Sequence, residues 1–345
     1  MLSLLSTIWN NKFNLPPPPP PNTFSGKSIL ITGATSGLGY AAAVHFVDLG
    51  AKSVVITGRS LEKGEQARAS IEAETGTKAK NIVKVIELDM STFESIKVFA
   101  DKVIKDVKEI DFVCLNAGAI STEHKIGKEG CETMIEISVL ASSFLALLLL
   151  PWMKEVGKGN AHLGIVTSGL HRNIQISNWP KDNVLKYWSS KKNWKSGQSG
   201  YALSKLLQQY AANEIAKLAL GTNERPEVIV NSICPGCPST HCMVKSNLGR
   251  EYNTNMAMRM GISLWSNLAC KTTEGGARTY VLAALTSPSE HGTHYTNYES
   301  EEKYKNSVKH NILGQEGQAM QKQVWKEVMR IIGEKYPTAI KRVSN

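Results

Sequence analysis

Short runs of β-branched and other apolar residues alternate along most of the chain with longer stretches in which apolar positions return every three or four residues. The short runs predict strands at residues 28–32, 53–57, 82–88, 112–115, 164–167 and 228–233. The longer stretches predict helices, and in residues 91–108 the apolar side chains fall on one helical stripe: Phe93, Ile96, Phe99, Val103, Ile104 and Val107. Such alternation is typical of one parallel sheet with helices on both faces. We therefore predict a single doubly wound α/β domain over residues 26–345, with ligands at the carboxyl ends of the strands.

Two apolar segments need a separate interpretation. Residues 139–153 are almost entirely apolar, but the run is too short to cross a bilayer and contains two serines and Pro151, which favours a helix buried in the core or at a subunit interface. Residues 1–25 combine a short apolar stretch, 1–9, with six consecutive prolines, 16–21, which form a stiff polyproline II spacer. This arm is expected to rest on the protein's own surface or to fray, and peripheral contact with a membrane or a partner is left open. No transmembrane segment is predicted.

Composition and charge narrow the class of protein. A hydrophobic content of 42% and a charged content of 20% are typical of a folded globular chain. The formal net charge is +10, but the basic residues form no run of five or six, which argues against nucleic-acid binding. A net positive charge also suits a phosphate-bearing ligand. The six cysteines are not regularly spaced, and no cleavable signal peptide is recognised before them. Both observations favour reduced thiols in the cytoplasm over disulfides. Because no second pair follows Cys234 and Cys237 at zinc-site spacing, no metal is expected.

A glycine-rich turn directly after the first predicted strand is a candidate phosphate site. Its backbone amides and the following helix N-terminus are suited to hold a pyrophosphate. The candidate residues are Gly33, Thr35, Ser36, Gly37, Leu38 and Gly39. The second predicted strand ends in Thr57-Gly58-Arg59-Ser60, without the acidic residue that binds a free ribose 2′-hydroxyl. Arg59, with Ser60 as a second donor, therefore predicts recognition of a 2′-phosphate and NADP(H) as the cofactor.

The order of the motifs along residues 26–298 resembles the short-chain dehydrogenase/reductase family. The resemblance rests on the TGxxxGxG spacing of the glycine turn, on Tyr201-Ala202-Leu203-Ser204-Lys205, and on Ser168 at the end of the fifth predicted strand. On a helix, Tyr201 and Lys205 share one face, and an adjacent ammonium favours the phenolate of a tyrosine that exchanges a proton. The resemblance implies a Rossmann fold and the roles of these residues: Tyr201 as proton donor and acceptor, Lys205 as ribose anchor, and Ser168 as the residue that orients the substrate carbonyl.

The same resemblance implies further cofactor contacts. They are Asp89 to the adenine, Asn116 beside the nicotinamide ribose, and Pro235, Gly236 and Thr240 flanking the carboxamide.

One position departs from the family pattern. Ser138 stands where the family carries an asparagine that helps to hold a water between the catalytic lysine and solvent. A serine hydroxyl still offers one donor and two acceptor lone pairs, although on a shorter side chain. Ser138 is therefore a candidate fourth member of the catalytic set, with a purely structural serine as the alternative.

A long insert separates two of the catalytic candidates. The 32 residues between Ser168 and Tyr201 exceed the dozen or so of compact family members, and they predict a substrate lid at about 172–198. The tryptophans Trp179, Trp188 and Trp194 are candidate substrate contacts, unless they only anchor the loop. A bulky hydrophobic substrate is expected.

The resemblance extends to the retinol-dehydrogenase-like and fungal secondary-metabolite tailoring branches of the family. We therefore predict an NADP(H)-dependent enzyme, a monomer or homodimer, that interconverts a ketone and a secondary alcohol on a polyketide or terpenoid. The alternatives are a retinoid- or steroid-type dehydrogenase, a non-redox isomerase on the same fold, and a non-catalytic cofactor-sensing protein. The intact Ser168, Tyr201 and Lys205 argue against the last of these.

Overall fold

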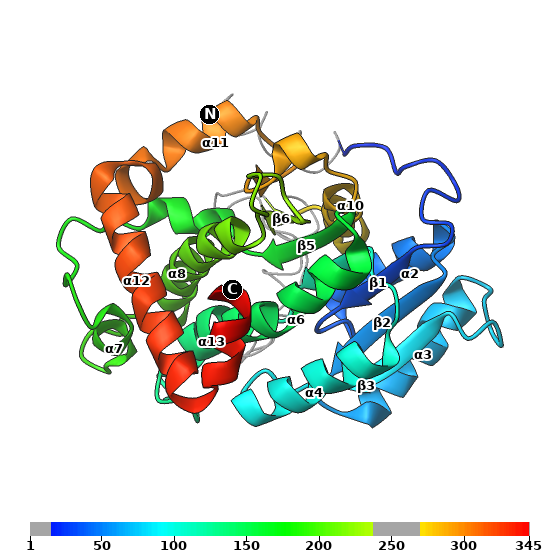
Figure 1. Cartoon of the computed structure of the whole chain (residues 1–345), viewed down its shortest axis with the longest axis horizontal. Helices are drawn as coiled ribbons and strands as arrows, with labels where there is room; N and C mark the ends of the chain where they lie inside the picture. Colours follow the sequence, from blue (N-terminus) through cyan, green and yellow to red (C-terminus); the bar gives the residue numbers. More distant parts are fainter. Residues whose placement is uncertain (1–14, 237–269, 345) are drawn as a thin grey trace, which may run out of the picture.

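A parallel sheet forms the centre of the molecule (Figure 1), for which the computed structural model describes residues 15–236 and 270–344. Within these residues the sheet has seven strands in the order β3-β2-β1-β4-β5-β6-β7, and every neighbouring pair is parallel. In chain order the strands are Ser28–Ile31 (β1), Ser53–Gly58 (β2), Val83–Glu87 (β3), Phe112–Leu115 (β4), Ala161–Val166 (β5), Val228–Ile233 (β6) and His294–Tyr295 (β7). Because the order reverses between β1 and β4, the carboxyl ends of these two strands border a crevice suited to a ligand.

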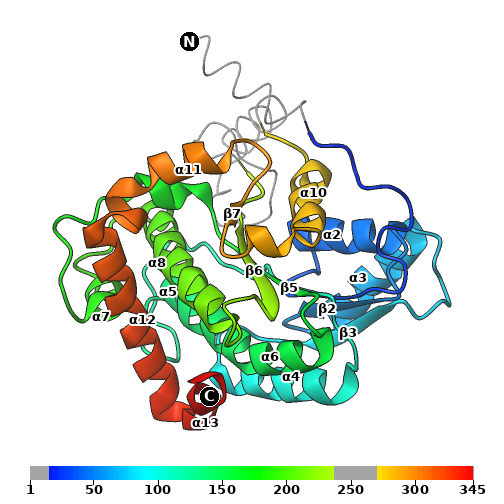
Figure 2. The same cartoon turned by 45° about the horizontal axis from the view of Figure 1, so that its top comes forward.

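Helices cover both faces of the sheet, since successive strand residues point to opposite sides. Leu30 and Val55 pack into one core, whereas their neighbours Ile29 and Val54 pack into the other. The first core is covered by α4 (Phe93–Asp106), α6 (Ser142–Gly157) and α8 (Gly197–Leu218). The second is covered by α2 (Gly37–Asp48), α3 (Leu61–Glu74) and α10 (Thr273–Ala283). Figure 2 shows α2 and α10 on one side of the sheet and α4 and α6 on the other, so the predicted doubly wound architecture is confirmed.

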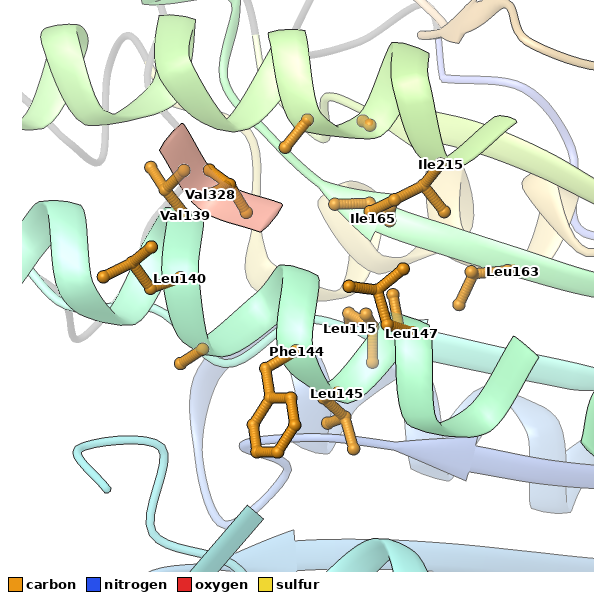
Figure 3. Packing of buried hydrophobic residues seen from close by; sticks show 14 of the residues in the cluster. Leu115, Val139, Leu140, Phe144, Leu145, Leu147, Leu163, Ile165, Ile215 and Val328 are labelled. Atoms are coloured by element: carbon orange, nitrogen blue, oxygen red, sulfur yellow. The ribbon is translucent and has the colours of Figure 1, made fainter. Parts of the chain in front are cut away.

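The apolar run of residues 139–153 is a core helix. In the described part of the chain, one helix, residues 133–157, is long enough and apolar enough to cross a membrane. However, 89% of its most apolar window is buried inside the protein. It starts as α5 (Thr133–Ile135), continues as a π-helical segment, η1 (Glu136–Ala141), and ends as α6. Figure 3 shows side chains from this helix, including Phe144 and Leu147, among strand and helix residues of the first core.

Helices at the carboxyl end complete that core. The remaining elements are η2 (Gly169–Asn173), α7 (Val184–Ser189), η4 (Pro288–Glu290), α11 (Glu301–Ser307), η5 (Lys309–Leu313), α12 (Gln315–Lys335) and α13 (Pro337–Ser344). Helix α12 packs on α8, and α13 packs on α6. The apolar face of the core helix is therefore covered by the chain itself.

The six predicted strands are all present, with shifts of up to three residues at their ends. The largest shift is in β5, which begins at Ala161, three residues before the predicted start. The short strand β7 was not predicted, because two residues carry no readable alternation. In the amino-terminal arm, the Pro16 carbonyl accepts a hydrogen bond of 3.1 Å from Arg278, which ties the start of the proline run to α10. The apolar stretch 1–9 lies outside the described residues.

Candidate active site

The glycine turn joins β1 to α2 at the carboxyl edge of the sheet. Gly33 and Gly37 have φ angles of +66° and +64°, in the left-handed region that favours glycine. A Cβ added to Gly39 would lie 2.6 Å from Asn116 Nδ2, so close packing against the β4 side requires glycine there. A Cβ added to Gly37 would meet nothing within 4 Å. Among the described residues the turn is thus packed on one side and open on the other, and the Ser36 side chain does not cap α2, a combination that fits a pyrophosphate bound by backbone amides.

The end of β2 lies beside this turn. A Cβ added to Gly58 would lie 2.5 Å from Thr35 Cγ2, which shows how closely the two segments approach. The next residue, Arg59, is exposed and makes no hydrogen bond or ion pair to any residue that the structure describes. Ser60 caps α3, since its hydroxyl accepts a bond of 3.4 Å from the Lys63 amide. Arg59 is therefore free to bind an anion next to the phosphate turn.

Two of the predicted cofactor-binding side chains make hydrogen bonds to the backbone of the protein itself. Asp89 Oδ1 accepts a hydrogen bond of 3.0 Å from the Ser91 amide and so shapes the turn between β3 and α4. Asn116 Nδ2 donates to the carbonyl oxygens of Thr32 and Gly33, at 2.8 and 3.1 Å. Its Oδ1 accepts a bond of 2.9 Å from the hydroxyl of Tyr280, a buried residue that the sequence interpretation missed. The Asn116 side chain consequently fixes the glycine turn to the end of β4.

The structure brings the three catalytic candidates together. Ser168 follows β5, and its side chain lies close enough to the hydroxyl of Tyr201 on α8 to influence the pKa of that hydroxyl. The Lys205 ammonium lies 5.5 Å from the centre of the Tyr201 ring. Burial raises the pKa of the Tyr201 hydroxyl, while the neighbouring Ser168 side chain acts in the opposite direction. Burial lowers the pKa of Lys205 from 10.5 to about 7. These groups can orient a carbonyl oxygen and exchange a proton with it.

A buried polar chain leads away from Lys205. Lys205 Nζ donates to the Val166 carbonyl oxygen at 2.9 Å and to Gln208 Oε1 at 2.7 Å. Gln208 Nε2 donates to Ser142 Oγ at 3.4 Å, and this hydroxyl donates to the Ile137 carbonyl oxygen at 3.2 Å. Gln208 was not among the predicted site residues, although its place three positions after Lys205 puts both on one side of the helix.

Ser138 lies near this chain, in the π-helical segment. The residue is fully buried, and its hydroxyl has no hydrogen-bond partner among the described residues. Ser142, rather than Ser138, supplies the hydroxyl that connects Gln208 to the core helix. The participation of Ser138 in catalysis stays a prediction.

The segment after β6 approaches the same site. Pro235 and Gly236 are described, whereas Thr240 and the second cysteine of the pair, Cys237, lie outside the described residues. Buried Cys234 accepts hydrogen bonds from the Gly169 amide, at 3.1 Å, and from the Tyr298 hydroxyl, at 3.3 Å. In the described ranges no group of three His, Cys, Asp or Glu side chains is arranged to hold a metal ion.

The insert folds against both α8 and α12. The amides of Val184 and Leu185, at the start of α7, donate to the two oxygens of Glu327 in α12, each at 2.9 Å. Trp179, Trp188 and Trp194 line a cavity of about 280 Å³ beside the first turns of α8. The structure thus brings the three predicted tryptophans together, and their contact with a substrate stays a prediction.

Known proteins resemble this chain in sequence and in fold. Residues 27–176 match the model of the short chain dehydrogenase family. A short-chain dehydrogenase/reductase from Aspergillus flavipes is 32% identical over 99% of this chain and 96% of its own length. Another from Phaeosphaeria nodorum is also 32% identical, over 92% of this chain and 89% of its own length.

Solved structures share the fold at lower identity. A short-chain dehydrogenase from Shigella flexneri is 20% identical and has a TM-score of 0.56, with 80% of this chain and 92% of that chain covered. A second, from Shigella flexneri 2a and complexed with NADP, is 20% identical and has a TM-score of 0.50, with 74% and 100% covered. The relatives confirm the predicted family and its fungal branch, and the structures confirm the Rossmann fold. With its glycine turn, its Ser168, Tyr201 and Lys205, and these relatives along nearly its whole length, the chain belongs to the short-chain dehydrogenase/reductase family of nicotinamide-dependent oxidoreductases.

Proposed function

We propose that the protein is an NADP(H)-dependent oxidoreductase that interconverts a ketone and a secondary alcohol on a bulky apolar substrate. The observation that carries the proposal is the meeting of Ser168, Tyr201 and Lys205 at the carboxyl edge of the sheet, beside a glycine turn that is open on one side. The fungal relatives support a substrate from secondary metabolism, a polyketide or terpenoid.

The residues of the chain divide the chemistry among them. When bound, a nicotinamide cofactor supplies or accepts the hydride. In the reducing direction, Ser168 donates a hydrogen bond to the carbonyl oxygen and Tyr201 gives that oxygen its proton. In the oxidising direction, the Tyr201 oxygen takes the proton back from the alcohol. A charged Lys205 favours the phenolate form of Tyr201 and lowers the cost of its proton transfer.

The cofactor would be held along the carboxyl edge. Amides of residues 33–39 and the α2 N-terminus would bind the pyrophosphate, and Arg59 and Ser60 would bind the 2′-phosphate. Tyr201 and Lys205 would hold the nicotinamide ribose. The preference for NADP(H) rests on the exposed guanidinium of Arg59 beside the turn, which has no hydrogen bond or ion pair to any described residue.

Cofactor choice is testable by direct binding. We expect NADPH to bind at least about tenfold tighter than NADH, which needs only ~1.4 kcal/mol from a charge-assisted bond. Arg59→Ala should abolish this preference, whereas Lys63→Ala, which removes a charge from the next helix turn, should keep it. Equal affinities for the two cofactors in the wild type would refute the NADP(H) assignment.

The catalytic assignment is tested by Tyr201→Phe. This variant should bind cofactor normally and lose at least ~10²-fold in turnover of a ketone, the low end for a missing general acid or base. Turnover at the wild-type rate would mean that the reaction occurs elsewhere.

The proposal also covers the cellular location and the oligomeric state of the enzyme. We infer a cytoplasmic location, because Cys114, Cys131 and Cys234 are buried and form no disulfide among the described residues. A monomer or homodimer stays a prediction.

A further inference from the structure

The residue that follows Ser168 is held at both of its backbone polar groups. The Gly169 amide donates a hydrogen bond of 3.1 Å to Cys234 Sγ, and the Gly169 carbonyl oxygen accepts one of 3.0 Å from Arg172 Nε. The amide belongs to the peptide group that joins Ser168 to Gly169. These two bonds therefore restrain the backbone at the point where the chain leaves β5 and enters the active site.

Arg172 is itself fixed by a buried ion pair with Glu299. Its two terminal nitrogens donate to the two carboxylate oxygens of Glu299, at 2.6 and 3.1 Å, and the two side chains are 10% and 2% exposed. Glu299 lies in the segment between β7 and α11, 127 residues after Arg172. Because this bidentate geometry uses the two terminal nitrogens, Nε remains to bind the Gly169 carbonyl oxygen.

The segment that carries Glu299 also supports the Gly169 amide. The hydroxyl of Tyr298 donates a bond of 3.3 Å to Cys234 Sγ, the same atom that accepts from Gly169. Both backbone bonds of Gly169 are thus connected to neighbouring residues of one distant segment, through Cys234 on one side and Arg172 on the other.

Stability alone does not explain a buried ion pair at this position. The loss of hydration of two charges offsets much of their attraction, and apolar residues of similar volume often stabilise a fold equally well. Apolar residues cannot, however, donate a hydrogen bond to the Gly169 carbonyl oxygen. The bond that they would lose restrains the backbone beside Ser168, whose Oγ accepts a bond of 3.4 Å from the Leu170 amide and still has a proton to donate.

We propose that Arg172 and Glu299 are positioning residues of the reaction, which hold the Ser168 hydroxyl where it meets the substrate carbonyl. They act through the backbone of residues 168–169 and not on the substrate itself. The inference rests on the proposed function, since it takes Ser168 to orient a carbonyl. A catalytic group that is misplaced by about 1 Å can cost on the order of 10²-fold in rate, so a small shift of Ser168 is enough to be measured.

Removal of the whole ion pair tests the proposal. Combining Arg172→Met with Glu299→Leu leaves no unpaired charge in the core, so this double variant is expected to fold. With α-tetralone as the ketone and NADPH as the cofactor, it should lose about tenfold to a hundredfold in kcat. Its KM for NADPH should stay unchanged, because the glycine turn is not altered. The matched control combines Lys305→Met with Glu301→Leu, which removes an exposed ion pair of α11 and should leave kcat at the wild-type value.

Addition of Ser168→Ala to the double variant shows whether the ion pair acts through Ser168. Ser168→Ala alone should lower kcat, and loss of the pair in that background should lower it no further. Losses that multiply in the triple variant would overturn the inference. A wild-type kcat in the double variant, with Ser168→Ala impaired, would also overturn it and would leave the proposed function intact.

A spectroscopic measurement tests the same contact without turnover. In the cofactor-free full chain with tyrosines labelled by ¹³C at Cζ, Ser168→Ala should shift the resonance of Tyr201, because the Ser168 side chain lies close to its hydroxyl. The double variant should also shift this resonance and the control should not, and an unmoved Tyr201 resonance in the double variant would refute the positioning role. Absence of α-tetralone reduction by the wild type would contradict the proposed function alone, since the resonance decides the inference separately.

Discussion

Replacing Lys205 with methionine should change the pH dependence of the stability of the cofactor-free protein. Lys205 is 3% exposed, and burial lowers its pKa from 10.5 to about 7. Between these two values the unfolded chain binds a proton at this position that the folded chain does not. The contribution of Lys205 to the free energy of unfolding therefore rises with pH across this window, and the full cost of burying the ammonium is present below pH 7.

The magnitude follows from the size of the shift. Each pKa unit corresponds to about 1.36 kcal/mol, so the cost is roughly 4–5 kcal/mol well below pH 7 and about 2 kcal/mol at pH 9. Methionine removes this cost but leaves the Val166 carbonyl and Gln208 Oε1 without their donor, at about 1–3 kcal/mol each. The second effect does not depend on the charge of Lys205. We therefore subtract the free energy of unfolding of the wild type from that of the variant. This difference should be about 2–3 kcal/mol larger at pH 6 than at pH 9.

Urea unfolding of both proteins at pH 6 and pH 9, followed by circular dichroism, measures this difference. Other titrating groups are common to the two proteins and cancel. The control is Lys217→Met, on the same helix, where an exposed lysine pairs with Glu214 and no such pH-dependent difference is expected. If Lys205→Met changed the unfolding free energy equally at both pH values, the buried ammonium would not have the depressed pKa on which the reasoning depends.

Three further changes probe the catalytic network and the insert. Gln208→Leu removes a hydrogen bond to the Lys205 ammonium worth ~1.5–3 kcal/mol, so the alkaline limb of the pH profile of kcat/KM should move down by about one to two pH units. Gln208→Glu should move this limb up, and the control Gln209→Leu should leave it in place. If the profiles of all three variants coincided with that of the wild type, Gln208 would have no role in setting the pKa of Lys205. Ser138→Ala should lower turnover a few-fold to about tenfold and Ser138→Asn should be tolerated, while turnover of the alanine variant equal to wild type at every pH would make Ser138 a purely structural residue. Shortening residues 179–194 should raise KM for large apolar substrates far more than for small ketones, and an equal effect on both would leave the insert only an anchoring role.

Features that depend on near neighbours in the chain were predictable from the sequence. The strands were found because alternation and β-branching are local properties, and the glycine turn because its left-handed positions demand glycine. Tyr201 and Lys205 were found because four residues make about one helical turn. The family resemblance then linked these local signals to Ser168, which the structure places close to Tyr201.

The tertiary structure alone decided which partners these residues have. Gln208 reaches Ser142 across 66 residues, and Tyr280 reaches Asn116 across 164. No pattern in the sequence marks such pairs, because each depends on how whole helices pack on the sheet. The same holds for the pKa of Lys205, which is lowered by desolvation inside a core built from distant segments.

The cavity beside α8 shows, for the insert, which features were readable from the sequence and which were not. Its tryptophans were visible as a group in the insert between Ser168 and Tyr201, where they predicted an apolar lid. That they would line one cavity together with Glu132 and Ile135 was not readable, since these two residues come from the start of another helix. The sequence thus determined the fold, the family and the candidate catalytic side chains through local spacing and family resemblance. Folding decided burial, partners and the shape of the cavity, because these arise only when distant segments exclude water together.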